Sequence, residues 1–205
     1  MNGRRTNLTI YSNPGCPFSH QVRLVINEKH IDADIINQDS ADWPEDVAAA
    51  NPYHSGPTLL DRNLSLFNAR IIIDYLDERF PHPSLMPADP VERAQLRLMI
   101  YRIERDWYSM WDALNGRERG KASKSRRTLQ EDLTVLAPLF SSSPFLMSND
   151  MTLLDCCLAP LLWHLPALNV KLPASAKAVE DYAQRIFQRE AFQASLTDTE
   201  RAIRP

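Results

Sequence analysis

A proline-rich stretch at residues 81–90 is the feature of this sequence that most constrains the fold. Four of these ten residues are proline. Proline fixes the backbone angle φ and lacks an N–H group, so this stretch cannot lie inside a regular helix or a central strand. It favours a stiff, extended connector. We therefore predict a domain boundary here, with one domain at residues 1–80 and a second at residues 91–205.

Before this connector, short β-rich runs alternate with amphipathic helical patterns. The expected order is strand, helix, strand, helix, then a hairpin and a last helix. In residue numbers, these elements are 8–11, 17–29, 33–36, 44–50, the hairpin 58–61 and 64–67, and a helix that starts at 68 and ends before 81. This βαβ-ββα order is typical of a thioredoxin-like domain.

After the connector, strand signals almost vanish. Helical periodicity covers residues 91–114, 127–139, 152–163 and 176–189. We expect an α+β protein whose N-terminal thioredoxin-like domain is followed by an all-helical domain. Thr152 and Asp155 fit a helix start with an acidic third residue. Cys156 and Cys157 follow in a strongly apolar run, which favours core packing.

Charge and targeting signals restrict the class of partner. The formal charge of −3 gives no global field that would attract nucleic acid or anionic lipid. A basic cluster is better explained as a solvated loop than as a nucleic-acid site, because no aromatic residues interleave with it. Its members are Arg117, Arg119, Lys121, Lys124, Arg126 and Arg127. We expect no direct nucleic-acid binding; any link would run through a protein partner.

The chain shows no signal peptide and no run long enough to span a membrane, so we expect a cytoplasmic protein with no membrane partner. Its three cysteines form no even framework and are expected to be reduced thiols. The five histidines lack the spacing of a metal site, so we predict no metal.

Two positions carry possible thiol chemistry. Cys16 stands where the first expected helix begins, and a helix N-terminus favours a thiolate. Ser19 would occupy the place of the resolving cysteine in a Cys-x-x-Cys pair. Monothiol exchange with glutathione is then the chemistry. The alternative is that Cys16 is simply a small buried apolar residue.

Gly56-Pro57 immediately precedes the third expected strand. Thioredoxin-like domains need a cis proline there, which leaves the preceding backbone groups available to an extended ligand. We therefore predict a cis bond between Gly56 and Pro57. The alternative is an ordinary trans proline in a loop, which is commoner for an arbitrary X-Pro bond.

Several segments together resemble the stringent starvation protein A family. They are residues 75–83 with 85–87 at the connector, 101–107, 158–163, and the tail 192–197 with Glu200 and Arg201. The resemblance runs from Tyr11 to Arg204. It implies a glutathione-transferase fold and a homodimer that binds RNA polymerase holoenzyme and its sigma factor. The resemblance also implies regulation of transcription during starvation or acid stress, typically without detectable transferase activity.

The resemblance further implies which surface the partner contacts. It points to Pro81, His82 and Pro83; the family's fourth position, a proline, is Ser84 here, which puts the last contact in doubt. A stiff proline segment loses little conformational entropy on docking. The alternative is that these prolines only hold two domains apart.

The same resemblance allows a test of the glutathione site. Active relatives commonly place an acid and then a serine at the start of the third helix, to hold the γ-glutamyl group. Here these positions are Asn68 and Ala69, so the strong charge-assisted hydrogen bonds are lost. Together with Gly56 and Pro57 they would form a vestigial glutathione site, with no required cofactor. A glutathione-dependent transferase or thiol transferase using Cys16 remains the alternative function.

Overall fold

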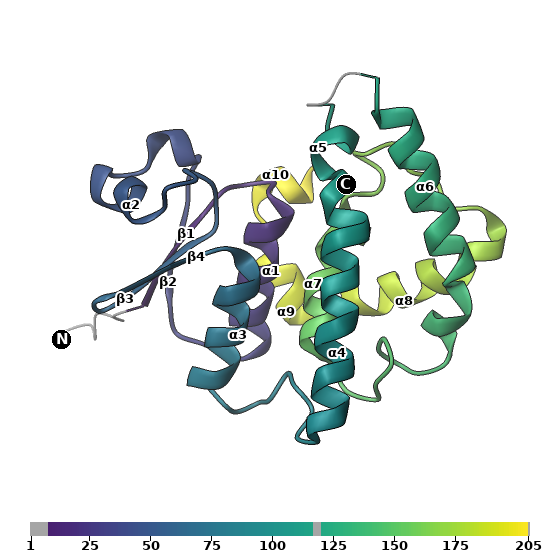
Figure 1. Ribbon diagram of the computed structural model, residues 1–205, viewed down its shortest axis with the longest axis horizontal. Helices are drawn as coiled ribbons and strands as arrows, with labels where there is room; N and C mark the ends of the chain where they lie inside the picture. Colours follow the sequence, from purple (N-terminus) through teal and green to yellow (C-terminus); the bar gives the residue numbers. More distant parts are fainter. Residues whose placement is uncertain (1–7, 117–119, 205) are drawn as a thin grey trace. The chain divides into compact units, whose positions relative to one another are not determined.

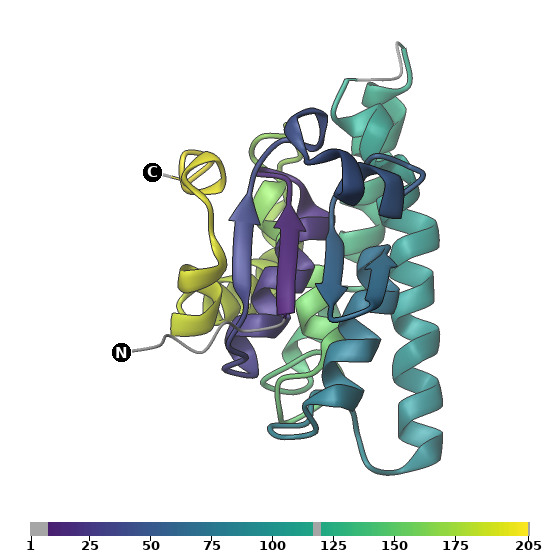
Figure 2. The same ribbon diagram turned by 90° about the vertical axis from the view of Figure 1, so that its left-hand side faces the viewer.

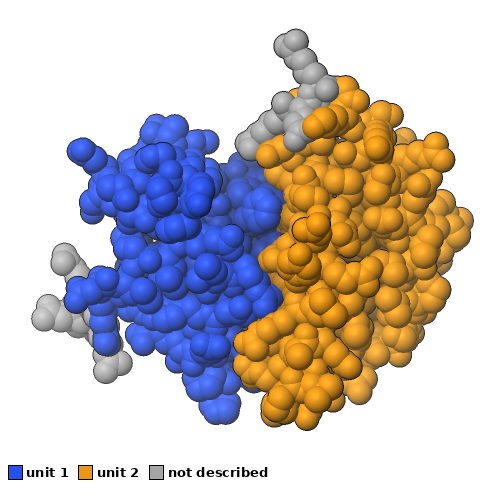
Figure 3. Space-filling view, viewed as in Figure 1, with its two compact units in different colours: residues 1–84, 190–203, 205 blue, residues 85–189, 204 orange. Residues whose placement is uncertain are grey.

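The computed structural model describes residues 8–116 and 120–204. Within this part, the chain forms two compact units, coloured separately in Figure 3. The first contains residues 8–84 and 190–203, and the second contains residues 85–189 with Arg204.

The first unit is built on a four-stranded mixed sheet. Its strands are β1 (Leu8–Ser12), β2 (Asp34–Asn37), β3 (Thr58–Asp61) and β4 (Leu64–Phe67), in the spatial order β2-β1-β3-β4. β1 is parallel to β2 and antiparallel to β3, and β3 and β4 form the predicted hairpin. Arg62 supports the hairpin turn with a positive φ of 56°.

Two helices cover one face of this sheet, as Figures 1 and 2 show from two sides. They are α1 (Pro17–Glu28) and α3 (Ala69–Arg79), while α2 (Glu45–Ala50) follows β2. The core between helices and sheet is apolar and fully buried: it contains Val22 and Val25 of α1, Ile72, Ile73 and Leu76 of α3, and Ile10 and Leu59 of the strands. The predicted α+β class and the βαβ-ββα order are confirmed.

The C-terminal tail does not belong to the unit in which the sequence analysis placed it. It forms α9 (Glu190–Ser195) and α10 (Asp198–Arg201), and residues 190–203 belong to the first compact unit. The sequence places this tail with the helical domain only because it follows that domain along the chain. In the structure, α9 packs against α1 instead.

Apart from one isolated β-bridge between Phe145 and Ser148, the regular secondary structure in the described residues of the second unit is helical. Its α-helices are α4 (Pro90–Arg102), α5 (Trp111–Leu114), α6 (Ala122–Val135), α7 (Leu153–His164) and α8 (Lys177–Phe187). The single helix expected over 91–114 is interrupted by a π-helical turn at Ile103–Trp107. This turn changes the helical phase, and Trp107 and the following Tyr108 are both buried.

Every residue of α7 is buried, so this helix forms the centre of the second unit. The Asp155 carboxylate accepts hydrogen bonds from the Thr152 N–H at 2.9 Å and from the Tyr182 hydroxyl at 2.6 Å. Burial raises the pKa of Asp155 above its ordinary value, although these donors act in the opposite direction. The predicted helix start at Thr152 and the core position of Cys156 and Cys157 are confirmed.

Candidate functional site

The turn after β1 presents Cys16 at the start of α1. Gly15 has a φ of +71°, which a glycine adopts without strain, and this reverses the chain before the helix. Cys16 is the N-cap residue: its carbonyl accepts the first helical hydrogen bond, from the His20 N–H at 3.0 Å. The side chain of Cys16 is half-buried at the positive end of a 12-residue helix. The predicted position of this thiol at a helix N-terminus is confirmed.

Ser19, in contrast, is buried and supports the turn that precedes α1. It is fully buried, and its hydroxyl oxygen accepts a hydrogen bond from the Asn13 N–H at 3.1 Å. The hydroxyl therefore closes the turn beneath Cys16. A side chain in this position stabilises the loop and is shielded from a ligand.

The bond between Gly56 and Pro57 is cis, as the sequence analysis predicted. The loop carrying it lies directly against the Cys16 turn. A Cβ atom added at Gly56 would collide with Asn13 Oδ1 and approach Ser19 Oγ to 2.7 Å. Only glycine therefore fits at this position without displacing these two side chains.

Asn51 holds this loop, and the sequence analysis did not single it out. The side chain is buried. Its amide group donates to the Ser55 carbonyl at 2.6 Å and to the Thr58 hydroxyl at 2.8 Å, while its oxygen accepts from the Tyr53 N–H at 3.1 Å. A polar residue directly after a helix and before a proline was the available signal.

The start of α3 contains Asn68 and Ala69, the two positions at which sequence analysis compared this chain with active relatives. Asn68 is its N-cap residue, with a φ of 77°, and the side-chain oxygen of Asn68 accepts a hydrogen bond from the Arg70 N–H at 2.9 Å. This oxygen thus occupies a backbone donor that an anion would otherwise use. Ala69 is buried, and its side chain has no polar group.

The proline segment, residues Pro81 to Ser84, lies at the end of the first unit. All four residues are exposed, and the His82-Pro83 bond is cis. From inside the unit, the Lys29 ammonium donates to the Pro83 carbonyl. The same ammonium forms an ion pair of 2.6 Å with Asp77 of α3.

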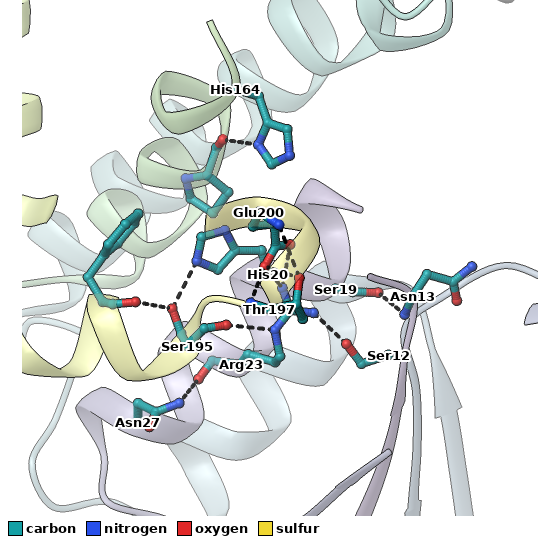
Figure 4. A network of polar contacts seen from close by, with 12 residues as sticks. Ser12, Asn13, Ser19, His20, Arg23, Asn27, His164, Ser195, Thr197 and Glu200 are labelled. Carbon is teal, nitrogen blue, oxygen red and sulfur yellow. Dashed lines mark hydrogen bonds and ion pairs between the residues drawn. The ribbon is translucent and has the colours of Figure 1, made fainter. Parts of the chain in front are cut away.

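A buried polar network connects α1 to the C-terminal tail (Figure 4). Arg23 donates to both carboxylate oxygens of Glu200, at 2.5 and 2.6 Å, and to the Ser195 carbonyl at 2.8 Å. It also bonds the Ser12 hydroxyl at the end of β1. Arg23 and Glu200 are 2% and 0% exposed, so the pair is fully desolvated. Sequence analysis noted Glu200 in the tail but assigned it no contact.

The other candidate regions show no site in the part of the chain that the structure describes. Of the basic cluster, Arg117 and Arg119 lie outside the described residues. Arg126 donates to the Leu168 carbonyl at 2.7 Å, and Arg127 pairs with Glu131 at the same distance. Residues 8–116 and 120–204 contain no cluster of three or more metal-binding side chains. In the same ranges, no helix has the length and apolar character needed to cross a bilayer.

Comparison with known families and proteins gives a consistent result. Residues 10–84 match the model of the glutathione S-transferase N-terminal domain, and residues 92–190 match that of the C-terminal domain. A glutathione S-transferase structure from Rhodospirillum rubrum superimposes with a TM-score of 0.81 at 21% identity, covering 93% of this chain and 92% of that one. This likeness establishes the glutathione-transferase fold.

Similarity in sequence extends over nearly the whole chain to a narrower group of proteins. The stringent starvation protein A homolog of Coxiella burnetii is 45% identical over 202 residues, covering 98% of this chain and 97% of that protein. The homolog of Haemophilus influenzae is 44% identical over 191 residues, covering 92% and 90% respectively.

Proposed function

This chain belongs to the stringent starvation protein A family, and we propose that it works by protein–protein binding, as a transcription regulator associated with RNA polymerase holoenzyme and its sigma factor. The proposal includes a homodimer in the cytoplasm that acts under stress, as the family resemblance implies. The proline segment is the proposed contact surface.

The proposal rests on the exposure of the proline segment and on the hydrogen bond that holds its backbone. Its residues expose their side chains, while a buried ammonium holds the carbonyl of Pro83 from the interior. A surface whose backbone is already ordered loses less entropy when a partner docks. This combination suits recognition by a protein and supplies no reactive group.

A direct binding experiment tests the proposal. Purified RNA polymerase holoenzyme is passed over the immobilised wild-type protein and over a His82→Ala/Pro83→Ala variant. We expect the wild type to capture holoenzyme. The dissociation constant of the variant should be at least tenfold larger, since truncation of central contacts typically costs about 1–4 kcal/mol of binding free energy. If the wild type captures no holoenzyme, the proposal is wrong.

A matched control comes from another exposed loop of the same unit. Pro52 and His54 are both exposed, and His54 has a φ of 46°, which asparagine tolerates well. A Pro52→Ala/His54→Asn variant therefore removes one proline and one histidine away from the proline segment. It should bind holoenzyme as well as the wild type does.

A second function has one observation in its favour. Cys16 is a half-buried thiol at a helix N-terminus, and the loop with the cis peptide before Pro57 lies against its turn. A glutathione-dependent transferase or thiol transferase would use it as the nucleophile. Alkylation of Cys16 by iodoacetamide, followed against pH by mass spectrometry, tests this. A thiol that reacts like free cysteine, with no glutathione binding by calorimetry, would exclude this function.

A further inference from the structure

Lys29 is buried, which is rare for a lysine side chain. It is the C-cap residue of α1, and its side chain is 0% exposed. Removing an ammonium from water costs several kcal/mol unless charged and polar partners compensate. An apolar side chain would fill this interior at lower cost. Polar contacts must therefore compensate the buried charge of Lys29.

Two contacts of this ammonium come from different parts of the first unit. The ammonium lies 2.6 Å from Asp77 Oδ1, on α3, and it donates to the carbonyl of Pro83. These partners are 48 and 54 residues away in sequence. One cation thus links the end of α1, the last turns of α3 and the proline segment.

Lys29 gives the proline segment a hydrogen bond that the prolines cannot supply themselves. Pro81 and Pro83 have no N–H groups, so the segment cannot order itself through a helical or sheet ladder. The side chains of Pro81, His82, Pro83 and Ser84 are exposed and do not fix the segment through burial. The hydrogen bond from Lys29 fixes the Pro83 carbonyl, and with it the peptide plane that follows His82 and Pro83.

We propose that Lys29 is a positioning residue for partner binding: its ammonium, oriented by Asp77, holds the Pro83 carbonyl so that His82 and Pro83 present a fixed shape to a protein partner. This inference rests on the proposed function and adds how its surface is pre-organised. The partner contacts the exposed rings, and Lys29 acts from behind them through one hydrogen bond.

The test removes both charges at once, because a single substitution would leave the other charge of this ion pair buried without its partner in the pair. The variant is Lys29→Met/Asp77→Asn, in the full chain. We expect holoenzyme binding about tenfold weaker than wild type, with a cooperative thermal transition retained. A second variant, Lys29→Gln/Asp77→Asn, keeps polar atoms in the interior, but its amide ends one atom short of Pro83. It should lose binding to a similar extent.

The matched control uses the neighbouring ion pair on α3. Arg70 and Asp74 are 3.1 Å apart and do not contact the proline segment in the described residues. Arg70→Met/Asp74→Asn makes the same change of charge within α3, the helix that also carries Asp77. It should leave holoenzyme binding within about twofold of wild type. If it weakens binding as much as Lys29→Met/Asp77→Asn does, the positioning role is wrong.

A double-mutant cycle separates positioning from general stability. Because Lys29 acts through Pro83, adding His82→Ala/Pro83→Ala to Lys29→Met/Asp77→Asn should weaken binding much less than it does in the wild type. Fully additive losses would overturn the proposal. So would wild-type affinity in both Lys29 variants.

A spectroscopic measurement on the free protein distinguishes this inference from the proposed function. The NMR signals of the His82 ring should shift in both Lys29 variants and stay unchanged in the Arg70→Met/Asp74→Asn control. If the wild type fails to bind holoenzyme, the proposed function is wrong and partner positioning is wrong with it. If holoenzyme binds but the His82 signals do not move, only the role of Lys29 is wrong.

Discussion

The Cys16 turn and the proline segment, both in the first unit, differ in where their polar groups lie and what these groups contact. Around Cys16, the Ser19 hydroxyl accepts a hydrogen bond from the Asn13 N–H and the Asn13 amide donates to the Ser40 hydroxyl, whereas Asn13 Oδ1 has no hydrogen-bond partner among the described residues. In the proline segment the side chains are exposed, and one carbonyl is held from the interior. A small-molecule site needs unsatisfied groups that face a ligand, whereas a docking surface needs an ordered backbone. The protein recognition that we propose would use the second of these features, at the proline segment.

The largest expected effect concerns the interior on which the Cys16 turn rests. Glu200→Ala would leave the Arg23 guanidinium buried without its carboxylate partner. We expect a loss of about 3–5 kcal/mol in the free energy of unfolding, measured by urea denaturation. The exposed pair of Lys177 and Asp181 provides the control, since Asp181→Asn should cost less than about 1 kcal/mol. Equal losses would contradict a buried role for Glu200.

A smaller effect is expected where the two loops meet. Gly56→Ala should destabilise the protein by about 1–3 kcal/mol, because the new methyl group meets Asn13 Oδ1 and Ser19 Oγ. Asn13→Ala in the same chain removes one of these obstacles. The double variant should therefore be more stable than the sum of the two single effects predicts. Simple additivity, measured by denaturation, would show that the loops do not touch in solution.

The third prediction concerns glutathione binding at the start of α3. Asn68→Asp/Ala69→Ser supplies a carboxylate for the glutathione ammonium and a hydroxyl for its carboxylate. We expect a gain of about tenfold in glutathione affinity, or about 1.4 kcal/mol, by calorimetry. The introduced carboxylate would still cap α3, since aspartate is as good an N-cap residue as asparagine. If the wild type binds glutathione as tightly as this variant does, Asn68 and Ala69 do not weaken glutathione binding, and the prediction is wrong.

The smallest effect on stability is expected in the proline segment. His82 is exposed, so His82→Ala should change the free energy of unfolding by less than about 0.5 kcal/mol. The same substitution should weaken holoenzyme binding. A large loss of stability would mean that His82 supports the fold, and the loss of binding would then say nothing about a contact surface.

Much of the fold was predictable because local patterns carry it. Period-two and helical spacing identified β1, β3, β4, α1 and α3, and the position before β3 identified the cis bond at Pro57. The interruption after α4 was missed, since a π-helical turn leaves no local compositional signal. The Cys16 and Asn68 positions could be read from the sequence because both depend on where a helix begins.

By itself, the sequence determined the order of the elements, the two-part organisation and the family. Each follows from periodicity, proline placement or full-length similarity. The tertiary structure decided where the C-terminal tail packs and what holds the proline segment. Arg23 and Glu200 are 177 residues apart, and Lys29 and Pro83 are 54 apart. No local pattern encodes such pairs; they form only when burial excludes water and leaves each charge in need of a partner.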